Sequence, residues 1–215
     1  TLFITFIKSS MKVTVIGAGN VGATCAYILS DKNICKEVVL LDIADGIPQG
    51  KALDMWEAAP VGSSSTSIIG TNSYADTANS DIIVMTAGKP RTPGMSRDDL
   101  LAANIEIMRS AIGEAAKASP NAIIIIVSNP LDAMCYTALK LTGFPAHRVF
   151  GMAGILDTAR YRTFIAMELG VSVKDVSAVV LGGHGDTMVP LPRLTTVGGV
   201  PFTELDSKER VDAIV

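Results

Sequence analysis

Short apolar runs alternate with longer helical segments from Lys12 onward. The runs are nearly continuous, with little alternation between apolar and polar positions, which indicates strands buried on both faces, as in a parallel sheet covered by helices. The runs KVTVI, VVLL, DIIVMTA and AIIIIV predict strands over residues 12–16, 38–41, 81–87 and 122–127. Helices are predicted over residues 20–31, about 46–58 and 98–118.

The repeated order of strand, helix and strand predicts an α/β fold, with a doubly wound, mostly parallel sheet of the Rossmann type and right-handed crossovers. After about residue 150 the pattern changes. A long helix near residues 154–169 is followed by the apolar run SAVVLG over 177–182 and by short strands separated by turns such as VGGVP. We therefore expect a first domain over residues 11–150 and a mixed α+β segment over 151–215.

Three further segments are interpreted from local composition. The Ser/Thr-rich stretch 62–67 is predicted to be a plain loop, and a new helix is predicted to open at Asp206 or Ser207. Residues 1–10, TLFITFIKSS, lack the basic leader and small-residue cleavage site of a signal peptide. Because Met11 directly precedes a strand, we treat residues 1–10 as an extension of unclear origin and expect the natural start at Met11.

Composition narrows the class of protein. With 48% apolar and 18% charged residues, the chain is typical of a soluble globular protein, and no run approaches the length of a membrane-spanning helix. The formal net charge of −3 and the lack of a dense basic cluster argue against a nucleic-acid partner. The three cysteines form no CxxC pair, so neither a disulfide framework nor a zinc site is indicated, which favours a reducing cytoplasm.

A glycine-rich turn follows the first predicted strand. Residues 17–22, GAGNVG, match the pattern GxGxxG between a strand and a helix, which is typical of dinucleotide binding. In this pattern the first glycine permits a tight turn, the second lets the backbone approach a diphosphate, and the third allows close packing of helix and strand. The predicted cofactor-binding residues here are Gly17, Ala18, Gly19, Asn20, Val21 and Gly22.

An acidic residue ends the second predicted strand. Asp42 lies 20 residues after Gly22, where a carboxylate can accept hydrogen bonds from the ribose hydroxyls of the adenosine half. Its negative charge would repel a 2′-phosphate. We therefore predict NAD rather than NADP as the cofactor.

Candidate chemistry lies in the second half of the chain. His184 is one of only two histidines and lies in the glycine-flanked turn LGGHGDTMVP. Asp157 and Arg160 are spaced i, i+3, so that they project from one helix face. If that face meets the His184 turn, the aspartate can fix the imidazole tautomer and the arginine can bind a carboxylate. The alternative is an ordinary ion pair within the helix.

Six motifs occur in order from about residue 11 to the end: GAGNVG, Asp42, AGKPRTPGMSR, VSNPLD, ILDTARYR and GGHGD. The set resembles the lactate and malate dehydrogenase family, and within it the malate dehydrogenases of lactate-dehydrogenase-like type. The resemblance implies an NAD-dependent oxidoreductase that acts on malate or oxaloacetate. It also implies that the mixed segment is a truncated substrate domain, because relatives continue well beyond the point where this chain ends.

The resemblance implies roles for particular residues. His184 is expected to be the general acid and base, oriented by Asp157, while Arg97 polarises the reacting oxygen and Arg160 grips the adjacent carboxylate. Asn129 is expected to contact substrate and cofactor. Asn104 and the backbone near Val127 lie where relatives touch the cofactor.

The resemblance also explains two arginines in the loop 88–97, which corresponds to a lid in relatives. In relatives specific for lactate, the position of Arg91 typically holds glutamine, whereas arginine there accompanies malate and oxaloacetate. A second substrate carboxylate needs a positive partner once water is excluded, because an unpaired buried ion is costly. Arg91 is therefore predicted to select the four-carbon diacid.

Two other functions remain open from the residues. One is a dehydrogenase of another 2-hydroxy acid, such as lactate. The other is a truncated NAD-binding module without turnover, because part of the substrate-domain wall would be missing. No membrane partner is expected, and the resemblance implies a homodimer or homotetramer.

Overall fold

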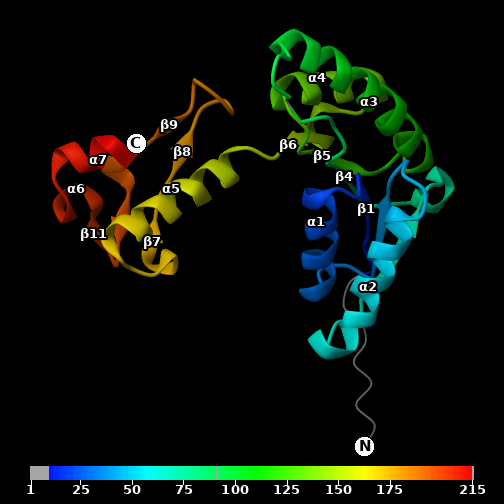
Figure 1. The fold of residues 1–215 in the computed structure, drawn as a ribbon, viewed down its shortest axis with the longest axis horizontal. Helices are drawn as coiled ribbons and strands as arrows, with labels where there is room; N and C mark the ends of the chain where they lie inside the picture. Colours follow the sequence, from blue (N-terminus) through cyan, green and yellow to red (C-terminus); the bar gives the residue numbers. More distant parts are fainter. Residues whose placement is uncertain (1–9, 91, 215) are drawn as a thin grey trace, which may run out of the picture. The chain divides into compact units, whose positions relative to one another are not determined.

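A computed structural model describes residues 10–90 and 92–214 of the chain. These residues belong to two compact units, one ending at Gly151 and the other beginning at Met152 (Figure 1). Each unit has its own elements and its own hydrophobic core.

The first unit is built on a six-stranded sheet in which all neighbouring strands are parallel. The strand order is β3-β2-β1-β4-β5-β6, so the doubly wound parallel sheet predicted from the sequence is confirmed. The strands are β1 Lys12–Ile16, β2 Glu37–Leu41, β3 Ser67–Thr71, β4 Ile82–Met85, β5 Ile123–Ile126 and β6 Val149–Gly151.

Four helices and two short 3-10 turns connect these strands. The helices α1 and α2 pack against each other, as do α3 and α4, which run side by side in Figure 1. The helices are α1 Asn20–Asp31, α2 Ile47–Gly62, α3 Arg97–Ala118 and α4 Leu131–Thr142. The 3-10 turns are η1 Tyr74–Thr77 and η2 Ala146–Arg148.

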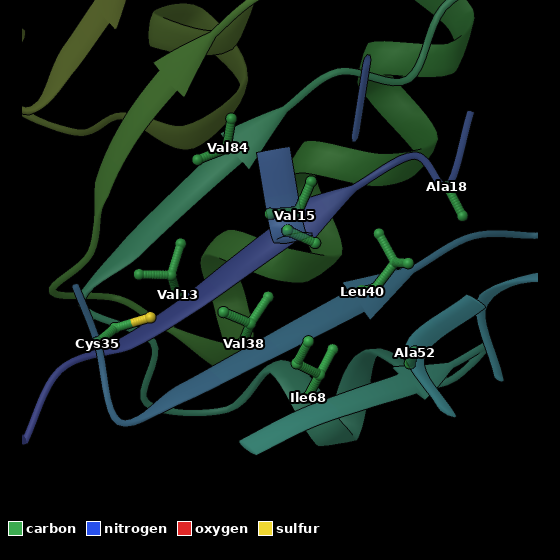
Figure 2. Close-up of a cluster of buried hydrophobic side chains, with 10 residues drawn as sticks. Val13, Val15, Ala18, Cys35, Val38, Leu40, Ala52, Ile68 and Val84 are labelled. Carbon is green, nitrogen blue, oxygen red and sulfur yellow. The ribbon is translucent and has the colours of Figure 1, made fainter. Parts of the chain in front are cut away.

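Side chains that alternate along the strands build a core on each face of the sheet. On the face covered by α1 and α2, Val13 and Val15 of β1 pack with residues of β2, β3 and β4, as Figure 2 shows. The opposite face carries the intervening residues. Among these, Ile83, Met85, Ile124 and Ile126 are fully buried, as are Met108 and Ile112 of α3 and Met134 of α4. Most residues of the central strands β1, β2 and β4 are therefore buried on both faces, which is the physical reason that these strands are largely apolar.

The sequence prediction differs from the structure in two strands, one helix and one helix end. The helix α4 and the three-residue strand β6 were not predicted. The strand β3 begins at Ser67, at the end of the stretch predicted to be a loop, and it was not predicted because its run SIIGT is short and carries a glycine. The helix α2 continues past residue 58 and through Pro60 to Gly62.

The second unit combines one long helix with very short antiparallel strands. Its three-stranded sheet has the order β11-β10-β7, and β8 pairs with β9. The helices are α5 Gly154–Leu169, α6 Phe202–Leu205 and α7 Lys208–Ile214, and the 3-10 turns are η3 Val173–Asp175 and η4 Pro192–Leu194. The strands are β7 Val176–Ser177, β8 Val180–Leu181, β9 Val189–Pro190, β10 Thr196–Val197 and β11 Val200–Pro201.

The core of the second unit forms along one face of α5. Tyr161 and Ile165 are four residues apart and pack with Phe202, whose side chain is fully buried, and with Val211 of α7. Asp157 lies one helical turn before Tyr161 and is also buried. The apolar face of α5 therefore ends in a buried carboxylate.

The apolar run over 177–182 does not form one continuous strand. The structure divides this region into β7, which pairs with β10, and β8, which pairs with β9. An apolar run predicts burial, but it does not specify with which neighbour each half forms hydrogen bonds.

The three cysteines are free thiols, and burial raises the pKa of each. The pKa of Cys35 reaches about 11, chiefly because the thiol is removed from water and secondarily because of the charge of Cys25. Since the thiolate is the reactive form, these side chains act as small apolar groups at neutral pH.

In the part of the chain that the structure describes, no helix is both long and apolar enough to cross a membrane.

Candidate functional site

The turn between β1 and α1 is shaped by its first and last glycines. Gly17 has a φ of +102°, and a Cβ there would lie 2.7 Å from the Ala87 nitrogen. A Cβ on Gly22 would lie 1.8 Å from the Gly17 carbonyl oxygen. Only glycine fits at these two positions, because any side chain would collide with backbone.

The middle of the turn is open. A Cβ on Gly19 would meet nothing within 4 Å. The helix α1 then starts at Asn20 with no side-chain cap and no acidic residue in its first turn. The first amides of a helix have no partner within the helix, and they carry the positive end of its dipole. The turn therefore presents free N–H groups where an anion can approach.

Replacing Gly22 with alanine should abolish tight NADH binding and destabilise the first unit by about 1–3 kcal/mol, the usual cost of overpacking. The reason is the 1.8 Å approach to the Gly17 oxygen, which α1 can relieve only by moving away from β1. NADH fluorescence titration and thermal unfolding measure the two effects.

The matched control is Gly113→Ala, a helical glycine of α3 at which a Cβ would meet nothing within 4 Å. It should keep or slightly raise stability, since alanine favours a helix by about 1 kcal/mol over glycine. NADH binding by Gly22→Ala at the wild-type affinity would contradict the packing argument.

Asp42 is held at the end of β2 by backbone amides. Its Oδ2 accepts a hydrogen bond of 2.6 Å from the Ala18 N–H, and its Oδ1 accepts one of 2.9 Å from the Ala44 N–H. The Asn72 side chain donates to the Asp42 carbonyl at 2.7 Å. Each carboxylate oxygen keeps a lone pair. The geometry fixes the carboxylate and leaves it able to accept hydrogen bonds from ribose hydroxyls.

A pocket of about 500 Å³ opens beside this turn, entirely within the first unit. It lies where the strand order reverses between β1 and β4, the place at which doubly wound sheets bind ligands. Its lining includes Gly19, Asn20, Val21, Gly22, Asn104, Val127 and Asn129, all named from the sequence. It also includes Thr86, Gly88, Lys89, Pro90 and Ser128, which were not named individually as site residues from the sequence, although residues 88–90 belong to the predicted lid loop. Their position directly after β4 and β5 is the signal that could have identified them.

Asn104 joins the two loops that border the pocket. Its side chain is buried on α3, where the amide group donates to the Asn129 carbonyl at 2.7 Å and to the Lys89 carbonyl at 3.2 Å. Its Oδ1 accepts from the Lys89 N–H at 2.7 Å. Both amide hydrogens are therefore engaged by the protein, and Asn104 holds the loops after β4 and β5 together.

The loop that carries the two predicted arginines ends in a strong helix start. Ser96 and Asp99 form a capping box, in which each side chain accepts from the other residue's N–H, at 3.0 Å and 3.1 Å. The hydrogen bonds from Ser96 lower the pKa of Asp99. Arg97 is the first residue of α3, but its side chain and the whole of Arg91 lie outside the described residues.

The second unit brings His184 and Asp157 together. The Nδ1 of His184, in the loop between β8 and β9, lies 2.9 Å from the Asp157 Oδ2. The Asp157 side chain is 4% exposed and that of His184 is 19% exposed. Because Nδ1 is engaged by a carboxylate, the Nε2 atom is left to exchange a proton with another molecule.

Arg160 lies on the same side of α5 as Asp157. Its Nη1 is 3.5 Å from the Asp157 Oδ1, and its side chain is 57% exposed. The contact is an ion pair rather than a hydrogen bond, since Oδ1 has no hydrogen-bond partner. Arg160 therefore keeps donors available for a second carboxylate. The three residues chosen from the sequence as the chemical centre of the second unit are close together.

The first unit fits a dinucleotide. The open space at Gly19 and the uncapped start of α1 suit a diphosphate, and the fixed carboxylate of Asp42 suits a ribose.

Among the described residues, no group of three or more His, Cys, Asp or Glu side chains is arranged to hold a metal ion.

Two family models match the chain in succession. The lactate/malate dehydrogenase NAD binding domain matches residues 11–151, and the lactate/malate dehydrogenase alpha/beta C-terminal domain matches residues 155–213.

Individual proteins similar to this chain are named malate or lactate dehydrogenase. The chain is 62% identical over 205 residues to the malate dehydrogenase of Chloroherpeton thalassium. The alignment covers 95% of this chain and 66% of that protein. The malate dehydrogenase structure from Salinibacter ruber superposes with a TM-score of 0.88 at 54% identity, covering 95% of this chain and 65% of that one.

A lactate dehydrogenase from Cryptosporidium parvum, solved with lactic acid and β-nicotinamide adenine dinucleotide, gives a TM-score of 0.88 at 45% identity. The alignment covers 96% of this chain and 67% of that one. The chain thus spans about two thirds of the length of the relatives that it matches. With both family models matched in order and two thirds of a malate dehydrogenase aligned at 62% identity, this chain belongs to the lactate/malate dehydrogenase family.

Proposed function

We propose that this chain carries the cofactor-binding and proton-transfer residues of an NAD-dependent malate dehydrogenase, which interconverts malate and oxaloacetate. The observation that carries the proposal is the pair formed by His184 and the buried Asp157, with Arg160 beside it. Relatives about 60% identical are named malate dehydrogenase, which supports this substrate over other 2-hydroxy acids.

His184 is the proton carrier. In the oxidation of malate, its Nε2 accepts the proton of the 2-hydroxyl group, and the imidazolium that forms is stabilised by the negative charge of Asp157 across the 2.9 Å contact. In the reduction of oxaloacetate, the same atom returns the proton to the oxygen. Asp157 does not itself take the proton; it holds the ring in one tautomer and orientation.

The first unit binds and orients the cofactor. The amides after Gly19 would hold the diphosphate, and the Asp42 carboxylate would accept hydrogen bonds from the adenosine ribose. Val127 and Asn129 border the remainder of the pocket, and Asn104 keeps their loop in place. A bound NAD would supply the hydride acceptor for malate oxidation, and a bound NADH would supply the hydride donor for oxaloacetate reduction.

The substrate carboxylates are assigned to arginines. Arg160 binds the carboxylate next to the reacting carbon, Arg97 polarises the reacting oxygen, and Arg91 binds the second carboxylate. Asn129 donates to the substrate. The planar guanidinium group suits this task because it can give two parallel hydrogen bonds to one carboxylate.

The test is the rate of NADH oxidation by this chain with oxaloacetate and with pyruvate. We expect clear turnover with oxaloacetate and a large preference for it over pyruvate. NADH binding without turnover would contradict the proposal and favour an NAD-binding module. A preference for pyruvate would instead favour a dehydrogenase of another 2-hydroxy acid.

We further propose that the protein is a homodimer or homotetramer in the cytoplasm, acting in the tricarboxylic acid cycle. The helix α2 supports an assembly, because Leu53 and Trp56 lie next to each other on its surface and are 54% and 53% exposed. The three free thiols support a reducing compartment. Light scattering of the purified chain measures the oligomeric state.

A further inference from the structure

A lysine of α2 contacts the glycine-rich turn. The Nζ of Lys51 donates a hydrogen bond of 2.6 Å to the Ala18 carbonyl oxygen. The Lys51 side chain is partly buried, and Ala18 is 1% exposed. Figure 2 shows Ala18 on the turn that follows β1, and its side chain belongs to the hydrophobic cluster that includes Ala52 of α2. None of the sequence motifs includes this lysine.

Two successive peptide groups of the turn are thereby held by opposite charges. The Ala18 N–H donates to the Asp42 carboxylate at 2.6 Å, and the Ala18 carbonyl accepts from the Lys51 ammonium at 2.6 Å. Hydrogen bonds to charged groups are about twice as strong as neutral ones. The orientation of the two peptide planes on either side of Ala18 is therefore set by the side chains of Asp42, which follows β2, and of Lys51 on α2.

This contact determines the direction of the next amide. In a trans peptide the C=O and N–H groups point in opposite directions, and the Ala18–Gly19 peptide is trans. Because Lys51 holds the carbonyl, the Gly19 N–H points away from α2. Gly19 lines the 500 Å³ pocket, and no atom lies within 4 Å of the place where its Cβ would be.

The charge of Lys51 adds to this effect. A cation at the carbonyl oxygen polarises the peptide and makes its N–H a stronger donor. Among the ion pairs of the described residues, none involves Lys51, so its positive charge is not cancelled by a carboxylate at contact distance. Both effects favour an anion at Gly19.

We propose that Lys51 is a positioning residue for the cofactor, which holds the Ala18 carbonyl so that the Gly19 N–H is presented to the diphosphate group of the dinucleotide. The proposal rests on the proposed NAD-dependent function. It adds a residue that acts through the backbone of the turn and does not itself touch the substrate.

The test compares Lys51→Met, Lys51→Arg and a matched control, Lys117→Met. Methionine matches the lysine side chain up to Cε but has no hydrogen-bond donor and no charge, while arginine keeps the donor and the charge. Lys117 lies at the end of α3, is 75% exposed and pairs only with Glu114 among the described residues. Calorimetry measures the Kd of NADH, of ADP-ribose, which has the diphosphate, and of adenosine, which lacks it.

Lys51→Met should raise the Kd of NADH and ADP-ribose by roughly tenfold to 100-fold, as expected for a hydrogen bond to a charged group. The Kd of adenosine should stay unchanged. Lys51→Arg should restore most of the affinity, and Lys117→Met should bind as the wild type does. The Gly19 amide resonance of the ligand-free protein should shift in Lys51→Met but not in Lys117→Met.

The outcomes separate this proposal from the proposed function. Equal affinity of wild type and Lys51→Met for NADH overturns the role of Lys51 alone. An equal loss of affinity for adenosine and ADP-ribose in Lys51→Met also overturns the role of Lys51, because the substitution would then have damaged the whole binding site and not the diphosphate contact alone. A wild-type chain that binds no NADH overturns the proposed function and the role of Lys51 together.

Discussion

Replacing His184 with asparagine is expected to lower kcat by roughly 100- to 10,000-fold, the usual contribution of a positioned general acid and base. Asparagine keeps a polar group near Asp157 but cannot take up a proton. The expected loss is the same for malate oxidation and oxaloacetate reduction, because the same Nε2 atom serves both. The affinity for NADH should stay close to that of the wild type, since His184 belongs to the second unit and the dinucleotide pocket lies within the first.

The chain provides a matched control in its other histidine. His147 lies exposed in the short turn η2 of the first unit, and His147→Asn should leave kcat unchanged. Steady-state kinetics with oxaloacetate and fluorescence titration with NADH measure the two properties separately. If His184→Asn turned over at the wild-type rate, His184 would have no part in proton transfer.

Replacing Arg91 with glutamine should shift preference from oxaloacetate toward pyruvate. The second carboxylate of oxaloacetate would lose its partner, and an unpaired ion in a site without water costs several kcal/mol, or roughly 100-fold or more in kcat/KM. Pyruvate carries a methyl group at that position. Removing the arginine charge therefore favours pyruvate, because the wild-type guanidinium would have to be buried there without an anion.

The measurement is the ratio of kcat/KM for the two substrates. Arg109→Gln is the control, since Arg109 is an exposed arginine of α3 that pairs with Glu106 at 3.7 Å. That variant should keep the wild-type ratio. An unchanged ratio in Arg91→Gln would show that substrate selection depends on other residues.

Much of the first unit could be predicted because its signals are local. Continuous apolar runs predicted β1, β2, β4 and β5, since these inner strands are largely buried. The strand β3 was not predicted, because a glycine and polar ends interrupt its run, and neither were the helix α4 and the three-residue strand β6. In the second unit the strands are only two residues long, and no periodicity can develop over so short a length.

For the candidate site, too, single residues could be predicted from the sequence, whereas the contacts between distant residues could not. Two separate motifs predicted His184 and Asp157, but their contact depended on a condition that the sequence could not test. The structure meets it, at 2.9 Å between residues 27 positions apart. Asn104 was named from the resemblance as a cofactor contact, and only the structure shows that its amide hydrogens bond to the loops of the protein.

By itself, the sequence determined the parallel sheet, the glycine turn with its acidic partner, and the family. These features are encoded in short contiguous segments, such as a run of apolar side chains or the turn in which Gly17 has a φ of +102°. Only the tertiary structure decided the neighbours of β7 and β8, the pairing of His184 with Asp157, and the contact of Lys51 with Ala18. Such contacts join segments distant in the chain, and their partners are selected by the packing of whole helices and strands.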